Sequence, residues 1–273
     1  MQHMIENELA KQLLTQKRDA GTIQRWTRAI YHRLLDESPY LDGGNFRRLH
    51  TDDLRRMFDL YDEFFFAGAC RKVLGEMPLT FRISQRMTLA AGKTMRHEHC
   101  TSQGLAFYRE FEIAVSSSLL MQTFCGEERE ATVSGLVCRD RLQALQRVME
   151  HEIVHLLEML LWHNSNCGSE RFQAIAERFF LHTHHTHALI TTRERAWREF
   201  GIRAGDWVTF SHRGARFTGR VNRITRRATV LVRDPRGVRY SDGNHYRKFY
   251  VPLTLLERTE APPELSKPAA EGA

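Results

Sequence analysis

Two histidines separated by three residues, with a glutamate beside the first, are the side chains of this 273-residue chain best spaced to do chemistry together. They are His151, Glu152 and His155. On a helix, positions i and i+4 lie on one face, so both imidazoles can bind one Zn²⁺ ion at about 2.0 to 2.1 Å. Glu152 is then placed to take a proton from a bound water and pass it to a leaving amine. The motif predicts a zinc metallopeptidase.

The segment 141–161 that carries this motif has the apolar spacing of a largely buried helix. Its leucine, valine, isoleucine and methionine residues recur at intervals of three and four. Ionisable side chains in such a helix cost free energy unless they are paired or bound to metal. The motif is therefore better explained as a site than as part of an ordinary core.

A catalytic zinc ion commonly takes three protein ligands and one water, so a third ligand is expected outside this helix. Cys167 lies in a predicted loop, just ahead of a helix predicted over 170–181 that Ser169 is expected to cap. Thiolate is a good zinc ligand, and we take Cys167 as the third ligand.

Other histidines stay open as the third ligand. His163 follows the predicted helix, and the run 182–187 holds four histidines, of which His182 and His187 are the candidates. Such a run is equally compatible with a metal site and with a solvated helix end.

The elements expected around the motif are helical at first and then rich in strands. Residues 1–50 form an N-terminal helical segment whose pattern over 5–36 breaks at Gly21, and an amphipathic helix is expected over 51–74. Strands follow. They are expected over 79–84, 87–96, 104–109 and 112–116. An edge strand near the metal is expected to pair with an extended substrate backbone.

Between about Leu54 and Leu181 this order of segments resembles the SprT-like metallopeptidases. The resemblance rests on LYDEFFFAG (60–68) ahead of the sheet, on LTFRIS (79–84), MTLAAGKT (87–94) and EIAVS (112–116), and on the HEIVH motif. It implies an α+β, zincin-type domain over 51–192 that acts on proteins bound or crosslinked to nucleic acid.

The resemblance departs from the family pattern at the third ligand. In the family that ligand is usually a histidine in a Gly-His-Gly type stretch, where this chain has Asn166-Cys167-Gly168. Cys167 would then replace the histidine. A thiolate leaves less positive charge on the metal, which should raise the pKa of a bound water relative to an all-histidine site.

Residues 200–258 differ in composition from the rest. Five short strands are expected, at 206–211, 215–224, 227–233, 237–241 and 246–251, with tight turns between them. Such a pattern predicts a small all-β barrel, and its opening resembles SH3-like barrels of the KOW or Tudor type. The tail 259–273 has the proline, glutamate and alanine content of a disordered end.

Positive charge is concentrated in this predicted barrel. Residues 201–258 contain thirteen arginines and lysines against four acidic residues, a balance of +9, whereas the whole chain carries +7. Arginines interleaved with aromatic residues suit phosphate and base contacts, so DNA or RNA is the expected partner; a solvated basic face is the alternative. The candidate nucleic-acid-binding residues are Arg216, Arg220, Arg223, Arg226 and Arg227.

Composition excludes several classes of protein. No apolar run approaches the length of a membrane span, and the first residues lack the pattern of a secretion signal. The five scattered cysteines suit a reducing cytoplasm. The alternative to an enzyme is a non-catalytic nucleic-acid-binding or transcription-associated protein with a structural zinc site. Glu152 favours the enzyme, because a structural site needs no carboxylate there; the oligomeric state is left open.

Overall fold

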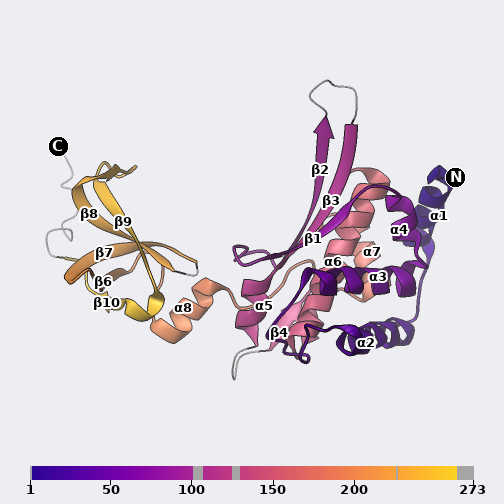
Figure 1. Cartoon of the computed structure of the whole chain (residues 1–273), viewed down its shortest axis with the longest axis horizontal. Coiled ribbons are helices and arrows are strands. Elements are labelled where there is room, and N and C mark those ends of the chain that lie inside the picture. The colour runs from indigo at the N-terminus through magenta and orange to yellow at the C-terminus, as the bar shows by residue number, and fades with distance from the viewer. Residues whose placement is uncertain (1, 101–106, 125–129, 226, 263–273) are drawn as a thin grey trace. The chain divides into compact units, whose positions relative to one another are not determined.

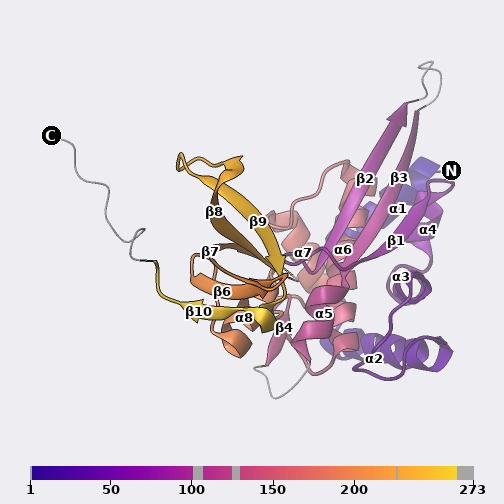
Figure 2. The same cartoon turned by 60° about the vertical axis from the view of Figure 1, so that its left-hand side comes forward.

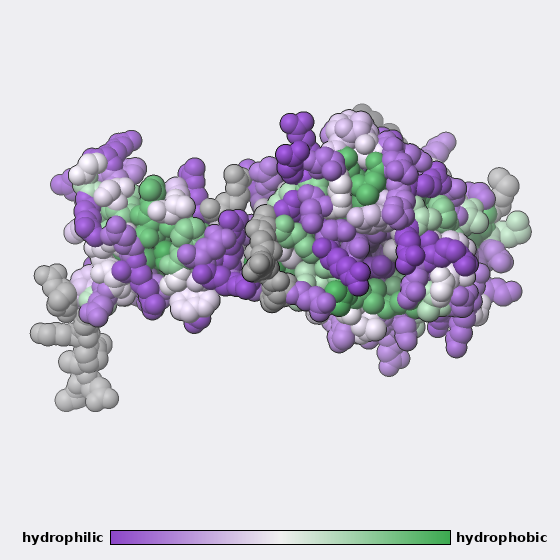
Figure 3. All heavy atoms as spheres, turned by 90° about the horizontal axis from the view of Figure 1, so that it is seen from below, coloured by the Kyte–Doolittle hydropathy of each residue, from purple (hydrophilic) through white to green (hydrophobic). Residues whose placement is uncertain are grey.

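The computed structural model describes residues 2–100, 107–124, 130–225 and 227–262. The chain divides into two compact units, one ending at Ile190 and one beginning at Thr191, and each has its own apolar core. Helices and sheets occur together (Figure 1), so the predicted α+β class is confirmed. In the view of Figure 3, hydrophilic side chains cover much of the visible surface of each unit.

The N-terminal helices belong to the core of the first unit. They are α1 (Gln2–Thr15), α2 (Ala20–Glu37), α3 (Thr51–Phe66) and α4 (Ala69–Leu74). The predicted break at Gly21 is wrong by a few residues, because Asp19 caps α2 by accepting a hydrogen bond from the Thr22 N–H at 2.8 Å. Gly21 therefore lies in the first turn of the helix. None of the described helices is long and apolar enough to cross a bilayer.

A three-stranded sheet packs beside the helices. Its strands are β1 (Leu79–Ser84), β2 (Gly92–Cys100) and β3 (Phe107–Ser116). The order is β1-β3-β2, with β1 parallel and β2 antiparallel to the central β3. β2 is thus an edge strand of this sheet, and it packs against α6 (Arg141–Trp162). Figures 1 and 2 show β2 and β3 projecting together beyond the helices.

Two predictions for this sheet need correction. The strands expected over 104–109 and 112–116 are one strand within the described residues, because β3 continues pairing with β2 through Glu110 and Phe111; residues 104–106 lie outside the described part. The strand expected from Met87 begins only at Gly92, after a loop in which the Met87 N–H donates to the Ser84 hydroxyl.

The helix that carries the motif begins and ends as predicted. Asp140 caps α6 by accepting from the Gln143 N–H, and Ser169 caps α7 (Glu170–Phe180) by accepting from the Phe172 N–H. α6 is largely buried in the core of the first unit. Its neighbours include the sheet, α3, α7 and the short helix α5 (Ser117–Thr123).

A small hairpin holds the histidine-rich segment that follows α7. The hairpin consists of β4 (Ala131–Val133) and β5 (Leu136–Cys138). The Ser134 N–H donates to the Thr186 carbonyl at 2.8 Å, and the Ala188 N–H donates to the Thr132 carbonyl at 2.7 Å. Segment 183–188 is therefore bound along β4 by backbone hydrogen bonds.

The second unit is a five-stranded antiparallel sheet preceded by one helix. Its elements are α8 (Thr192–Phe200), β6 (Trp207–His212), β7 (Ala215–Ile224), β8 (Ala228–Arg239), β9 (His245–Val251), a 3₁₀ turn (Leu253–Leu255) and β10 (Glu257–Thr259). The strand order is β10-β6-β7-β8-β9.

Five strands were expected here; one of them is wrong, and one strand of the structure was not predicted. The strand predicted over 237–241 is largely the far end of the long β8, which re-pairs with β9 after a register shift between Arg233 and Val238. The fifth strand is β10, which pairs with β6. Thr259 therefore lies in a strand and not in the predicted tail, of which residues 263–273 lie outside the described part.

We expect Gly135→Ala to destabilise the first unit more than Gly68→Ala. Both glycines have a positive φ, +79° and +76°, where a Cβ costs about 1 to 2 kcal/mol. A Cβ at Gly135 would also overlap Thr183 Oγ1 and His184 Nδ1, whereas none of the described heavy atoms lies within 4 Å of one at Gly68. Overlap of this kind adds about 1 to 3 kcal/mol. Urea unfolding of both variants measures the difference, and equal losses would contradict the packing of the hairpin on segment 183–188.

Candidate metal centre

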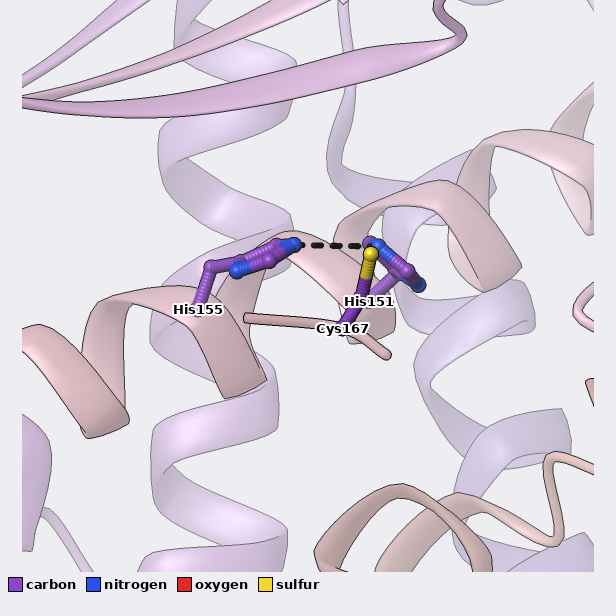
Figure 4. Close-up of side chains that lie close together, drawn as sticks. All are labelled: His151, His155 and Cys167. Carbon is purple, nitrogen blue, oxygen red and sulfur yellow. Dashed lines mark hydrogen bonds between the residues drawn. The ribbon is translucent and has the colours of Figure 1, made fainter. Parts of the chain in front are cut away.

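Three side chains from α6 and the loop after it converge in the first unit. They are His151, His155 and Cys167, whose potential ligand atoms all lie within 4.8 Å of one another. Figure 4 shows the two imidazoles, with the Cys167 sulfur close to His151. Their Nε2 atoms are 3.1 Å apart. The three predicted metal ligands are thus brought together.

This geometry fits a tetrahedral zinc ion. Bond lengths of about 2.0 to 2.1 Å to nitrogen and 2.3 Å to sulfur place ligand atoms roughly 3.3 to 3.6 Å apart. The observed separation of the two nitrogens is close to that value, and the sulfur needs a small adjustment at most. Two neutral imidazoles and one thiolate form a donor set that suits zinc.

A buried glutamate fixes the loop that carries Cys167. Glu158, one helical turn beyond the motif, is fully buried. Its carboxylate accepts hydrogen bonds from the Ser165 hydroxyl at 2.6 Å, the Asn166 N–H at 3.3 Å and the Arg171 Nε at 2.6 Å. Because Asn166 directly precedes Cys167, these bonds hold the sulfur beside the two imidazoles.

The same network orients His155. Its Nδ1 lies 2.7 Å from the Ser165 hydroxyl, which also donates to Glu158. A hydroxyl has one hydrogen, and Ser165 gives it to Glu158, so its oxygen accepts a hydrogen bond from the His155 Nδ1–H. The His155 Nε2 then keeps its lone pair for a metal. The Phe172 ring of α7 packs against both imidazoles, with centroid distances of 4.8 Å to His151 and 4.6 Å to His155.

Glu152 points to the edge strand of the sheet. Its carboxylate accepts a hydrogen bond from the Thr94 hydroxyl at 2.8 Å, and the same hydroxyl lies 3.0 Å from the Glu152 carbonyl. Gly92, two residues earlier on β2, lets the strand approach, because a Cβ there would overlap the Glu152 carboxylate. The structure therefore places Glu152 next to the candidate ligand His151 and against β2.

In the absence of metal, burial favours the uncharged forms of these side chains. It raises the pKa of Glu152 to about 7, against the opposing effect of the Thr94 hydrogen bond. Burial also lowers the pKa of His151 to about 3, with added repulsion from His155 and the histidine-rich segment, and lowers the pKa of His155 to about 4. Neutral imidazoles are the form that binds metal.

The alternative third ligands have other partners. The buried His182 Nε2 lies 2.8 Å from the Glu150 carboxylate, and the His187 Nε2 lies 3.1 Å from the Leu89 carbonyl. His163 adopts a left-handed conformation as the C-cap of α6. None of these three belongs to the group found among the described residues.

Glu150 is the centre of a buried polar network next to His151. It accepts hydrogen bonds from the Tyr61 hydroxyl at 2.6 Å and from Arg147 at 2.9 Å, besides its contact with His182. Although burial opposes ionisation, Arg147 lowers the pKa of Glu150 below its ordinary value. The network joins α3, α6 and the start of the histidine-rich segment.

The predicted nucleic-acid-binding arginines lie on the second unit. Arg216 forms an ion pair with Glu257 at 2.7 Å, and Arg220 donates to the Gly205 carbonyl at 3.0 Å. Arg223 and Arg227 are exposed. Arg226 lies outside the described residues.

Comparison of the chain with protein-family models, with curated proteins and with solved structures finds no significant match. The case for a function therefore rests on the residues themselves.

Sequence reasoning missed the residues that support the centre. Thr94, Gly92 and Ser165 are small residues whose roles depend on contacts across the fold. Glu158 had a usable signal, because it is a carboxylate on the apolar face of a predicted buried helix.

We expect the purified protein to hold about one zinc ion, and His151→Ala or Cys167→Ala to lose most of it on brief dialysis against a chelator. His163→Asn is the matched control, since asparagine tolerates the left-handed conformation there and His163 is not in the group. Elemental analysis by mass spectrometry measures the zinc. Retention of zinc by Cys167→Ala together with its loss from His182→Gln would identify His182 as the third ligand.

We expect Ser165→Ala to weaken zinc binding by about 10- to 100-fold, the usual effect of removing a partner of a ligating histidine. Ser169→Ala is the control, because it removes the N-cap of α7 at the end of the same loop but leaves the contact between Ser165 and His155 intact. Competition with a chromogenic chelator measures the affinity. Equal losses in both variants would show that Ser165 acts through loop stability alone.

Proposed function

We propose that the first unit is a zinc-dependent metalloendopeptidase of SprT-like type. The observation that carries the proposal is the convergence of His151, His155 and Cys167, with Glu152 next to the first ligand on the same helix. Two imidazoles, a thiolate and a neighbouring carboxylate form the donor set and the base that such an enzyme needs.

The chemical roles follow from the positions of the side chains. His151, His155 and Cys167 would hold the ion, which when bound supplies Lewis-acid activation of a water molecule and of a substrate carbonyl. Glu152 accepts the proton of the attacking water and returns it to the departing amine. Thr94 holds the Glu152 carboxylate against β2.

Three protein ligands leave a coordination position for substrate. A structural zinc site is closed by four protein ligands, whereas the group among the described residues has three. The histidines expected as candidates for a further ligand, His182 and His187, contact Glu150 and Leu89 instead. This supports an enzyme over the alternative of a non-catalytic protein with structural zinc.

The edge strand β2 suits an extended protein substrate. Gly92 and Thr94 of β2 lie against Glu152, and β2 pairs with β3 along one side. A peptide that adds to the other side would run past the centre, with affinity from backbone hydrogen bonds.

We further propose that the substrates are proteins associated with DNA or RNA. The support is the +9 balance of residues 201–258, which suits the second unit, as an SH3-like module, to bind phosphate backbones. Contacts of this kind carry no sequence information.

We expect Glu152→Gln to keep the zinc and the fold but to lower cleavage by about 10² to 10⁴-fold, the contribution of a general base. Glu170→Gln is the matched control, since Glu170 lies in the exposed first turn of α7. Cleavage of a purified DNA-binding protein, followed with and without DNA, measures the effect. A wild-type protein that holds zinc yet cleaves no substrate, with Glu152→Gln unchanged, would favour the structural zinc site.

We expect Gly92→Ala to lower cleavage as well, by displacing Glu152, while zinc content stays near that of the wild type. The added methyl group would overlap the Glu152 side chain, which supplies the three heavy atoms nearest to it. Parallel assays of zinc and cleavage separate the two effects. Unchanged cleavage would show that the observed position of Glu152 is not the one used in catalysis.

A further inference from the structure

We propose that one face of the second unit's sheet binds a single strand of nucleic acid, with phosphates on its cations and a base on Tyr250. We call it the β7–β9 face and define it by two rows of paired residues: Arg220, Leu231 and Lys248, then Arg223, Thr229 and Tyr250. The inference deepens the proposed association with nucleic acid and does not depend on the peptidase.

The strand register puts these six side chains on one side of the sheet. Arg220 pairs with Leu231, which pairs with Lys248. In the next row Arg223 pairs with Thr229, which pairs with Tyr250. Directly paired residues point to the same face. The residues between the rows point to the other face.

Those intervening residues are buried, which confirms the assignment of faces. Val221, Val230 and Phe249 form one buried row, and Ile224, Ala228 and Val251 form the next. At a register shift between Val221 and Arg223, the exposed Asn222 is an extra residue without a partner on β8, and Arg223 therefore points to the outer face. Such a bulge re-aims a side chain.

The outer face carries cations without acidic neighbours in the two rows. Arg220, Arg223 and Lys248 are exposed, and Arg220 and Lys248 are separated by two strand spacings, roughly 10 Å. Three acidic residues of the second unit form ion pairs with arginines outside the two rows: Asp206 with Arg258, Asp234 with Arg247 and Glu257 with Arg216. The positive charge of this face is therefore available to an anion.

An exposed aromatic ring lies among these cations. The Tyr250 side chain is 64% exposed in the same row as Arg223, and its neighbour Lys248 lies two residues away on β9. The partly buried Leu231 lies between Arg220 and Lys248. An exposed ring between cations is the arrangement on which unpaired bases stack while the backbone phosphates bind the charges.

This combination favours a single strand over a duplex. In a duplex the bases are paired and stacked, so Tyr250 would have no base to contact, and only the phosphates could bind. Stacking and phosphate contacts also distinguish poorly between sequences. We therefore expect binding without sequence preference, and similar binding of DNA and RNA strands.

The test is the affinity of the full chain for fluorescein-labelled dT20, measured by fluorescence anisotropy. We expect Tyr250→Ala to weaken binding by about 5- to 150-fold, as for one lost base stack, and Tyr250→Phe to bind like the wild type. The triple variant Arg220→Gln, Arg223→Gln, Lys248→Gln should weaken binding at least tenfold. It should also lower the salt dependence by about two in the log–log slope.

A second triple variant is the matched control, because it removes three cations that lie outside the two rows. It carries Arg213→Asn, Arg236→Gln and Arg239→Gln, and we expect it to retain most of the affinity. If the wild type binds dT20 but both triple variants weaken it equally, or Tyr250→Ala has no effect, the β7–β9 face is not the site. At least tenfold tighter binding of a 20-base-pair duplex would also overturn the inference. If the wild type binds neither dT20, U20 nor the duplex, the proposed association with nucleic acid fails as well.

Discussion

The first unit depends on the burial of ionisable residues along α6, because each of them needs a partner inside the core. Glu150, Glu152 and Glu158 are all buried, and isolated buried carboxylates are costly. Tyr61 of α3 and His182 satisfy Glu150, Thr94 of β2 contacts Glu152, and the loop after α6 satisfies Glu158. The helix thus specifies which elements must surround it. His151, His155 and Cys167 each offer one ligand atom that a metal ion would use.

These partners explain why His182 is not a member of the group His151, His155 and Cys167. His182 is one helix beyond the motif and could have been drawn to the metal, but its bond to Glu150 holds it in the core. The hairpin β4–β5 then fixes the backbone that follows, through Ser134 and Thr132. The histidine-rich segment is therefore held by backbone hydrogen bonds, and Cys167 of the short loop is the third member of the group that could bind a metal.

The sequence predicted the features that depend on residues close together in the chain, but not the contacts between residues far apart in the chain. The helix α6, the cap of α7 at Ser169 and the grouping of His151, His155 and Cys167 follow from spacing within about thirty residues. The predicted strand ends were wrong where a turn or a register shift sets them, as at Gly92 and in the long β8. The register shift within β8 has no clear signal in the sequence. Thr94 and Gly92 could not be connected to Glu152 at all, since their contact joins residues 58 and 60 positions apart.

The short chain distance between the ligands has a consequence for the order of assembly. His151, His155 and Cys167 lie within seventeen residues of one another, so closing this loop costs little entropy. The contact between β2 and Glu152 joins residues far apart in the chain, and such long-range contacts form slowly. Under the proposed function, the segment from α6 to α7 would be able to bind its ion while the sheet is still unformed. A bound metal ion would then show only that α6, α7 and the loop between them have folded. Catalysis would also require β2 to pack against Glu152, which would happen later.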